Sequence, residues 1–212
     1  HTKVLWGKDT ITDAIGEIKY QISAQSFYQV NPPQTLRLYQ TALDFADVKP
    51  GETVWDMYCG IGTITLFLAA AVGGSGQVLG VEIVPEAVEN ARTNAALNQL
   101  TNVEFFCGAA EEVVGSEMVR DKVGPAGMKA DVVVVDPPRK GCDGVLLDTI
   151  LAMKPKRIVY VSCDPATLAR DVKVLAEGAH GTKYEVKKVQ ACDMFPQGGH
   201  VESVVLMSKV DK

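Results

Sequence analysis

Residues 161–165, with the sequence VSCDP, place a lone cysteine, Cys163, where an apolar run gives way to a helix start. The run before it, RIVYV at residues 157–161, is β-branched and apolar, as a central parallel strand should be. Asp164 and Pro165 then supply a helix cap and a first-turn proline. Because a helix N-terminus favours a thiolate, Cys163 is a candidate nucleophile. A small buried core residue is the alternative, since free cysteines are usually buried.

Glu202 is the candidate base to work with such a thiol. It heads an otherwise apolar run at residues 204–207. Partial burial there would raise the pKa of the carboxyl toward the range that suits a general base. A strand-end surface charge is the alternative for Glu202, and His200 is interpreted as a structural or orienting residue.

Residues 56–62, DMYCGIG, lie at the first strand-to-helix turn and indicate a cofactor site. Small glycines such as Gly60 let backbone N–H groups approach a ligand closely. Neither the dinucleotide GxGxxG nor a P-loop lysine is present. Glu82 ends the second strand, a position suited to accepting hydrogen bonds from a ribose diol. Together they predict S-adenosylmethionine rather than NAD; a plain glycine turn with a solvated acid is the alternative.

Residues 136–141, DPPRKG, follow the fourth strand at the same sheet edge and indicate a substrate loop. The two prolines stiffen the loop and have no N–H to donate. Asp136 can accept from a polar substrate edge, and Arg139 can contact a phosphate or a base as a planar fork. A solvated charged turn is the alternative.

The elements that must position these residues alternate along the chain. Apolar strands are predicted at 53–56, 77–83, 102–106, 131–135 and 157–161, and helices from 63 to 71, 85–98, 110–119 and 166–175. This alternation predicts an α/β fold with a doubly wound, mostly parallel sheet. Two further strands, 183–190 and 201–207, make it seven-stranded and should form an antiparallel pair at one edge.

Ahead of this unit the chain is expected to be organised differently. Residues 11–30 are strand-like, residues 31–33 cap a helix that runs to about residue 46, and residues 124–127 are predicted to form a surface loop. We therefore divide the chain into a β lead-in segment at 1–30 and a catalytic domain at 31–212.

Composition bounds the class of protein. The 212 residues are 47% hydrophobic, which fits one globular domain with a normal buried core. The formal net charge of −5 gives no global electrostatic reason to bind nucleic acid. Five cysteines form no CxxC or Cys/His ligand set, so neither a metal site nor a disulfide framework is predicted, and a reducing cytoplasm is favoured. No membrane span or signal peptide is visible, and the absence of an initial Met leads us to expect a piece of a longer protein.

The motifs together resemble the RNA uracil-5-methyltransferase family, whose members use S-adenosylmethionine. Five of them run in order through nearly the whole chain: 26–31 (SFYQVN), 56–62, 136–141, 162–165, and 193–196 (DMFP) with 200–202. The sequence KGCD at residues 140–143 is most similar to that of bacterial 23S ribosomal-RNA members of the family. The resemblance implies the Rossmann-like fold of class I methyltransferases and methyl transfer to carbon 5 of a uridine, in rRNA rather than tRNA.

The resemblance also implies a role for individual residues. Cys163 would be the nucleophile, Glu202 the proton-abstracting base, and Asp136 and Arg139 would lie near the target base. The residues lining the S-adenosylmethionine site would be Gln29, Tyr58, Gly60, Thr63, Glu82 and Asp136.

The chain departs from the family pattern in two places. Family members usually carry an N-terminal RNA-binding β-barrel, often followed by an iron–sulfur segment. Because the chain has neither, we expect a catalytic part that binds RNA weakly alone, and a monomer. Residues 197–199, QGG, also stand where a Thr- or Ser-containing turn is more common.

Three other functions compete with this interpretation. An amino-group methyltransferase acting on nucleic acid or protein would resemble (Asn/Asp)-Pro-Pro-Tyr and need no nucleophile, whereas this chain has DPPR and Cys163. A non-catalytic fragment that binds RNA or cofactor would not need both Cys163 and Glu202. An NAD-dependent dehydrogenase is disfavoured by the missing GxGxxG.

Overall fold

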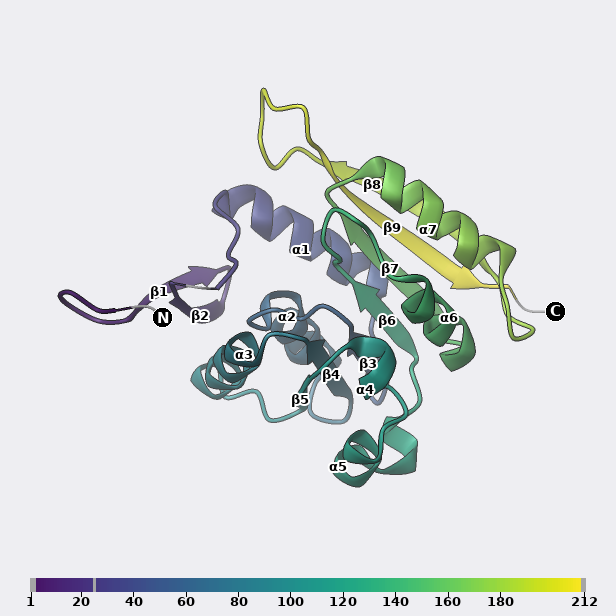
Figure 1. The fold of residues 1–212 in the computed structure, drawn as a ribbon, viewed down its shortest axis with the longest axis horizontal. Coiled ribbons are helices and arrows are strands. Elements are labelled where there is room, and N and C mark those ends of the chain that lie inside the picture. Colours follow the sequence, from purple (N-terminus) through teal and green to yellow (C-terminus); the bar gives the residue numbers. More distant parts are fainter. Residues whose placement is uncertain (1–2, 25, 211–212) are drawn as a thin grey trace.

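The structure, a computed structural model, describes residues 3–24 and 26–210. A seven-stranded sheet with the order β5-β4-β3-β6-β7-β9-β8 forms its centre, and a two-stranded hairpin precedes it (Figure 1). The hairpin strands are β1 (Thr10–Ile15) and β2 (Ile18–Ser23). The sheet strands are β3 (Thr53–Asp56), β4 (Gln77–Glu82), β5 (Val103–Cys107), β6 (Val132–Val135), β7 (Arg157–Ser162), β8 (Tyr184–Cys192) and β9 (Glu202–Lys209). The helices are α1 (Pro32–Ala46), α2 (Thr63–Val72), α3 (Pro85–Leu97), α4 (Ala110–Val113), α5 (Glu117–Gly127), α6 (Gly144–Met153) and α7 (Pro165–Glu177).

Both faces of the sheet are buried along β3, β4, β6, β7 and β9, which explains why these strands are largely apolar, whereas the outermost strand β8 is mostly exposed and carries charged residues. Successive side chains of a strand point to opposite faces, so Val54 joins one hydrophobic cluster and Trp55 the other. Buried residues of α1, α2 and α3 belong to the first cluster, and those of α4 to α7 belong to the second. The fold is therefore doubly wound, as the sequence predicts.

The direction of the strands also agrees with the prediction. β5, β4, β3, β6 and β7 are parallel, whereas β9 is antiparallel to both β7 and β8. β9 lies one position in from the edge, so β8 is the outermost strand. In Figure 1 the hairpin lies at one side of the molecule and the β8–β9 pair at the other.

Several local predictions are wrong or incomplete. The helix predicted at 110–119 is two helices, α4 and α5, and the surface loop predicted at 124–127 is the end of α5. Within α5 only Gly124 has a non-helical conformation, with φ 69° and ψ 175°, and the helix continues after it. The strand-like stretch 11–30 is a hairpin that turns at Gly16, φ 57°, followed by non-strand residues 26–31. Helix α6 was not predicted.

The capping predictions at α1 and α7 are confirmed. The Asn31 side chain accepts a hydrogen bond from the Gln34 N–H at 3.4 Å, with prolines in the first turn of α1. The Asp164 carboxylate caps α7. None of the helices in the described part of the chain is long and apolar enough to cross a membrane.

Candidate active site

Four acids and Cys163 gather at one edge of the sheet because of strand direction; of these, all but Asp56 were predicted site residues. Asp56, Glu82 and Asp136 stand at or directly after the carboxyl ends of the parallel strands β3, β4 and β6. Cys163 follows β7. Since β9 runs the other way, its first residue, Glu202, arrives at this same edge. Open α/β sheets bind their ligands there.

Cys163 and Glu202 come together through the pairing of β7 with β9. The last pair of this ladder is Ser162 with Ser203, and Cys163 and Glu202 are the next residue on each chain segment. They are close enough for the charge of Glu202 to act on the Cys163 thiol. Glu202 is 8% exposed, as its apolar run predicts, and Cys163 is half-buried. A thiol and a carboxylate therefore face the same space from neighbouring strands.

The acids at this edge raise one another's pKa. Burial, followed by repulsion from Glu202 and Asp56, raises the pKa of Asp136 to about 8. Burial raises the pKa of Glu202, while the positive charge of Arg139 opposes the shift. Arg139, which is exposed, is thus the cation that the structure sets beside the acidic cluster.

The expectation of a favoured Cys163 thiolate is wrong for the ligand-free protein. Burial raises the pKa of the thiol, and the negative charges of Glu202 and Asp136 raise it further. The dipole does not compensate, because the Asp164 carboxylate already accepts from the first-turn N–H groups of α7, at 2.9 Å from Ala166 and 3.0 Å from Thr167. Of the nearby charges, Arg139 lowers the thiol pKa.

The glycine turn and Glu82 form one hydrogen-bonded unit. The Glu82 carboxylate accepts from the Gly60 N–H at 3.1 Å and from the Val84 N–H at 2.9 Å. Gly60 has φ 54° and faces open space, and no side chain caps α2, which starts at Thr63. Glu82 keeps unused lone pairs, so it can also accept from a ligand's hydroxyl groups.

Two residues in or near the turn at residues 56–62, which we call the cofactor turn, were not assigned to the site from the sequence. Asp56 is 1% exposed; its Oδ2 accepts from Thr65 at 2.7 Å, while its Oδ1 has no hydrogen-bond partner in the described part of the chain. Burial raises its pKa to about 6. Tyr39 of α1 is buried against Thr63, with Asp136 and Asp56 close enough to raise its pKa. A tyrosine in an apolar helix pattern gives no sequence signal of such a position.

The segment before α1 is tied to the loop between β8 and β9. The Asn31 side chain donates from Nδ2 to the Met194 carbonyl at 2.8 Å. This holds the stem of loop 193–201, which projects beyond the β8–β9 pair in Figure 1.

Two residues predicted to line the cofactor site have the following surroundings. Gln29 is half-buried in the segment before α1. Tyr58 lies against Cys142, which directly follows the substrate loop. The roles of all the residues assigned to the site from the sequence stay predictions.

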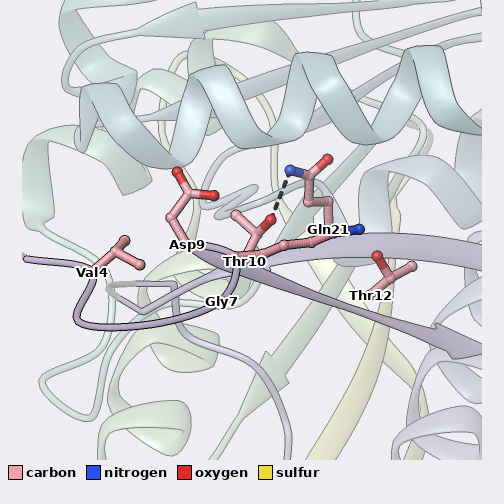
Figure 2. Close-up of a pocket in the computed structure, with 7 residues that line it drawn as sticks. Val4, Gly7, Asp9, Thr10, Thr12 and Gln21 are labelled. Atoms are coloured by element: carbon pink, nitrogen blue, oxygen red, sulfur yellow. Dashed lines mark hydrogen bonds between the residues drawn. The ribbon is translucent and has the colours of Figure 1, made fainter.

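A separate hollow lies on the N-terminal hairpin. Figure 2 shows it, with Gln21 Nε2 donating to Thr10 Oγ1 at 3.0 Å. It is lined by Val4, Gly7, Lys8, Asp9, Thr10, Thr12 and Gln21. Because none of these is a residue of the sheet edge, the hollow is distinct from the candidate active site.

Sheet order, helix arrangement and an edge of glycines and acids define the class of protein: the Rossmann-like fold of S-adenosylmethionine-dependent methyltransferases. A family model described as tRNA (uracil-5-)-methyltransferase matches residues 2–210. The chain belongs to this family. The expected RNA uracil-5-methyltransferase resemblance is confirmed.

Curated relatives agree with the family assignment. An uncharacterised RNA methyltransferase from Bacillus cereus is 57% identical over 211 residues, covering 100% of this chain and 43% of the relative. Another, from Clostridium acetobutylicum, is 52% identical over 208 residues, and the match covers 98% of this chain and 42% of the relative. The chain thus spans less than half the length of these relatives.

Solved structures are similar as well. The tRNA (uracil-54, C5)-methyltransferase of Pyrococcus abyssi, in complex with S-adenosyl-L-homocysteine, is 34% identical with a TM-score of 0.78, covering 95% of this chain and 45% of that one. The predicted cofactor is therefore confirmed at the level of the family. TrmN from Thermus thermophilus shares the fold. It is 21% identical with a TM-score of 0.61, and the match covers 95% of this chain and 59% of TrmN.

Proposed function

We propose that this chain is the catalytic part of an enzyme that methylates carbon 5 of a uridine in RNA through a covalent bond to Cys163. The observation that carries the proposal is that Cys163 and Glu202 directly adjoin the last pair of the β7–β9 ladder and lie within electrostatic reach of each other, at the edge that also holds Glu82 and Gly60. Methylation of an amino group needs no nucleophile from the enzyme, so that reaction would leave Cys163 and Glu202 without a catalytic role.

The cofactor we propose is S-adenosylmethionine, which supplies an electrophilic methyl group when bound. Glu82 would accept from the ribose hydroxyls, and the open turn at Gly60 would let the backbone approach the ligand. The buried, unpartnered Oδ1 of Asp56 and the acidic Asp136 suit a ligand that carries positive charge. We assign Gln29, Tyr58 and Thr63 to the same site.

We assign a residue of the chain to each chemical step at the uracil ring. Carbon 5 of uracil is a poor nucleophile, and addition of the Cys163 thiolate to carbon 6 moves the double-bond electrons toward the carbonyl oxygen, which activates carbon 5. Once carbon 5 is methylated, Glu202 takes its proton, the double bond re-forms and the Cys163 sulfur leaves. Asp136 and Arg139 would hold the polar edge of the base or a neighbouring phosphate.

The substrate we propose is a uridine of ribosomal RNA. The base would have to be turned out of its stack, which favours single-stranded or loop sites. The resemblance of the KGCD sequence at 140–143 to bacterial 23S ribosomal-RNA members of the family supports rRNA over tRNA. Mapping methylated uridines in total RNA with and without the gene decides this: loss of methylation from tRNA alone would overturn the rRNA assignment.

The roles of the two residues are separable in the complete protein. Cys163→Ala should abolish both turnover and the covalent RNA adduct. Glu202→Gln should slow turnover by about 10²–10⁴-fold, the usual contribution of a general base, and accumulate a denaturant-resistant complex that carries labelled methyl. A denaturing gel with labelled methyl donor measures both. Uridine methylation by Cys163→Ala would refute the covalent route, and methylated amino groups would indicate the competing class.

A further inference from the structure

The loop that carries Arg139 is attached to α7 by several hydrogen bonds, in addition to its two prolines and an internal hydrogen bond from the Gly141 N–H to the Pro138 carbonyl at 2.8 Å. Arg170 Nη2 donates to the Lys140 carbonyl at 2.9 Å and to the Cys142 carbonyl at 3.3 Å. The Thr167 hydroxyl donates to the Arg139 carbonyl at 3.0 Å. Three carbonyls of this loop therefore accept from one face of a single helix.

Asp171 completes the attachment from inside the protein. Its side chain is fully buried, and its Oδ2 accepts from the Cys142 N–H at 2.8 Å and from the Tyr160 hydroxyl at 2.6 Å. Its Oδ1 accepts from Arg170 Nε at 2.7 Å, which orients the guanidinium toward the loop. A buried carboxylate is costly unless it is paired in this way.

Gly141 shows how closely the helix and the loop approach. Its φ is 77°, and a Cβ there would lie 2.6 Å from Arg170 Nη2 and 2.6 Å from Asp171 Oδ2. The loop backbone thus lies directly on the polar side chains of α7. At its far end, the Cys142 thiol contacts Tyr58 of the cofactor turn.

We propose that Arg170 and Asp171, with Tyr160, are positioning residues that fix the substrate loop at 136–141, together with the adjoining Cys142, and so aim Arg139 at the nucleic-acid substrate. α7 begins at Pro165, two residues after Cys163, so one rigid helix sets the loop relative to the proposed nucleophile. Arg139 is exposed, and among the described residues its side chain has no hydrogen-bond or ion-pair partner, so the loop backbone that carries it sets its direction. The consequence for uridine methylation rests on the proposed function; the attachment of the loop does not.

Trypsin tests the attachment without any assay of activity, because the loop contains the cleavage sites Arg139 and Lys140. Arg170→Ala is the main variant, since this side chain is 53% exposed and its loss opens no core cavity. Lys173→Ala is the matched control: it lies on the same helix and pairs only with the exposed Glu177 in the described structure. We expect faster cleavage of the folded complete protein after residues 139 and 140 in Arg170→Ala, and the wild-type rate in Lys173→Ala. Equal rates in all three proteins would overturn the proposal.

A double-mutant cycle tests the consequence for the substrate. Arg170→Ala should lower kcat/KM for RNA by roughly tenfold to 10²-fold, the scale of a displaced positioning group, with the affinity for S-adenosylmethionine unchanged. In an Arg139→Ala background the same substitution should have little further effect, because it acts through Arg139. Tyr160→Phe, which keeps the ring and removes the hydroxyl, should show the same dependence. Additive losses would overturn the proposal, whereas a wild-type protein that methylates no uridine but shows the trypsin result would refute only the proposed function.

Discussion

At the scale of single residues, the main finding is that the surroundings of Cys163 disfavour the thiolate that the proposed mechanism requires. Burial and two neighbouring carboxyls raise the Cys163 pKa, and Asp164 uses the helix N–H groups that would otherwise favour the thiolate. Among the neighbouring charges, that of Arg139 acts in the opposite sense and lowers the thiol pKa.

Alkylation of Cys163 by iodoacetamide measures this balance. Glu202→Gln removes a negative charge beside the sulfur, so the thiol pKa should fall and the rate at a fixed pH below that pKa should rise by up to about tenfold. Arg139→Ala should do the opposite. Peptide mass spectrometry reads each cysteine, and the exposed Cys107 is the internal control whose rate should not change. A Cys163 rate unaffected by either substitution would contradict the charge assignment.

Glu82 belongs to the residue scale as well. Glu82→Ala should weaken S-adenosylmethionine binding by about 1.5–3 kcal/mol, or ten- to hundredfold, because hydrogen bonds to a charged acceptor are lost and the Gly60 N–H loses its partner. Calorimetry measures the affinity. Glu86→Ala, which removes an exposed acid in the first turn of α3, is the control. Equal affinity in Glu82→Ala and wild type would remove Glu82 from the site.

At the scale of elements, a row of asparagines joins the hairpin to the cofactor turn. Asn94 accepts from the Gln21 N–H at 2.7 Å, and Asn98 accepts from the Lys19 N–H at 2.9 Å. Asn90 donates to the Ser23 hydroxyl at 3.1 Å. Four residues of helix rise about 6 Å and two residues of strand about 6.6 Å, so α3 and β2 match along their length.

Asn94 is the residue of this row on which the cofactor turn depends. It is fully buried, and its Nδ2 also donates to the Ile61 carbonyl at 3.1 Å. Asn94→Ala should lower the free energy of unfolding by about 1–3 kcal/mol, since it leaves buried backbone groups unpaired, and should weaken cofactor binding. Urea denaturation and calorimetry measure the two effects. Asn98→Ala, at the hairpin's more exposed end, should cost less stability; the reverse order would contradict this account.

How far the sequence predicts the molecule depends on whether a feature is local. Apolar β-branched runs, helix caps and the edge residues Cys163 and Glu202 are local patterns, and the structure places them as predicted. Asn94 and Asp171 are buried, yet each lies on a helix among polar residues that resemble a solvated face. Their partners are far away in sequence, and no spacing along the chain indicates them. The error on the Cys163 pKa has another cause: Asp164 was counted as a cap but not as the group that occupies the helix N–H groups.

At the scale of the whole molecule, the acids of the site should make the stability of the ligand-free protein depend on pH. The folded protein holds a proton on Asp136 up to a pKa of about 8 and on Asp56 up to about 6, against an ordinary carboxyl value of 3.8. Between about pH 4 and 8 the folded state therefore binds more protons than the unfolded state. Stability should fall as the pH rises through this window, by at most about 1.4 kcal/mol per pH unit for each such proton.

Asp136→Asn isolates this contribution, because the amide cannot ionise in either state. The variant should lose the share of Asp136 in the decline across about pH 4 to 8, and this loss should be clearest between pH 6 and 8, where Asp56 is ionised in both states. Its stability should therefore gain on that of wild type as the pH rises. Asp131 and Asp164, whose pKa values are lowered, act in the opposite sense at more acid pH, where stability is lost as the pH falls. Urea unfolding of the ligand-free chain at pH 5, 6, 7 and 8 measures the slope, with the exposed Asp121→Asn of α5 as the control. Parallel pH curves for wild type and Asp136→Asn would show that Asp136 is ionised at neutral pH, and the acidic edge would then carry its full negative charge before any ligand binds.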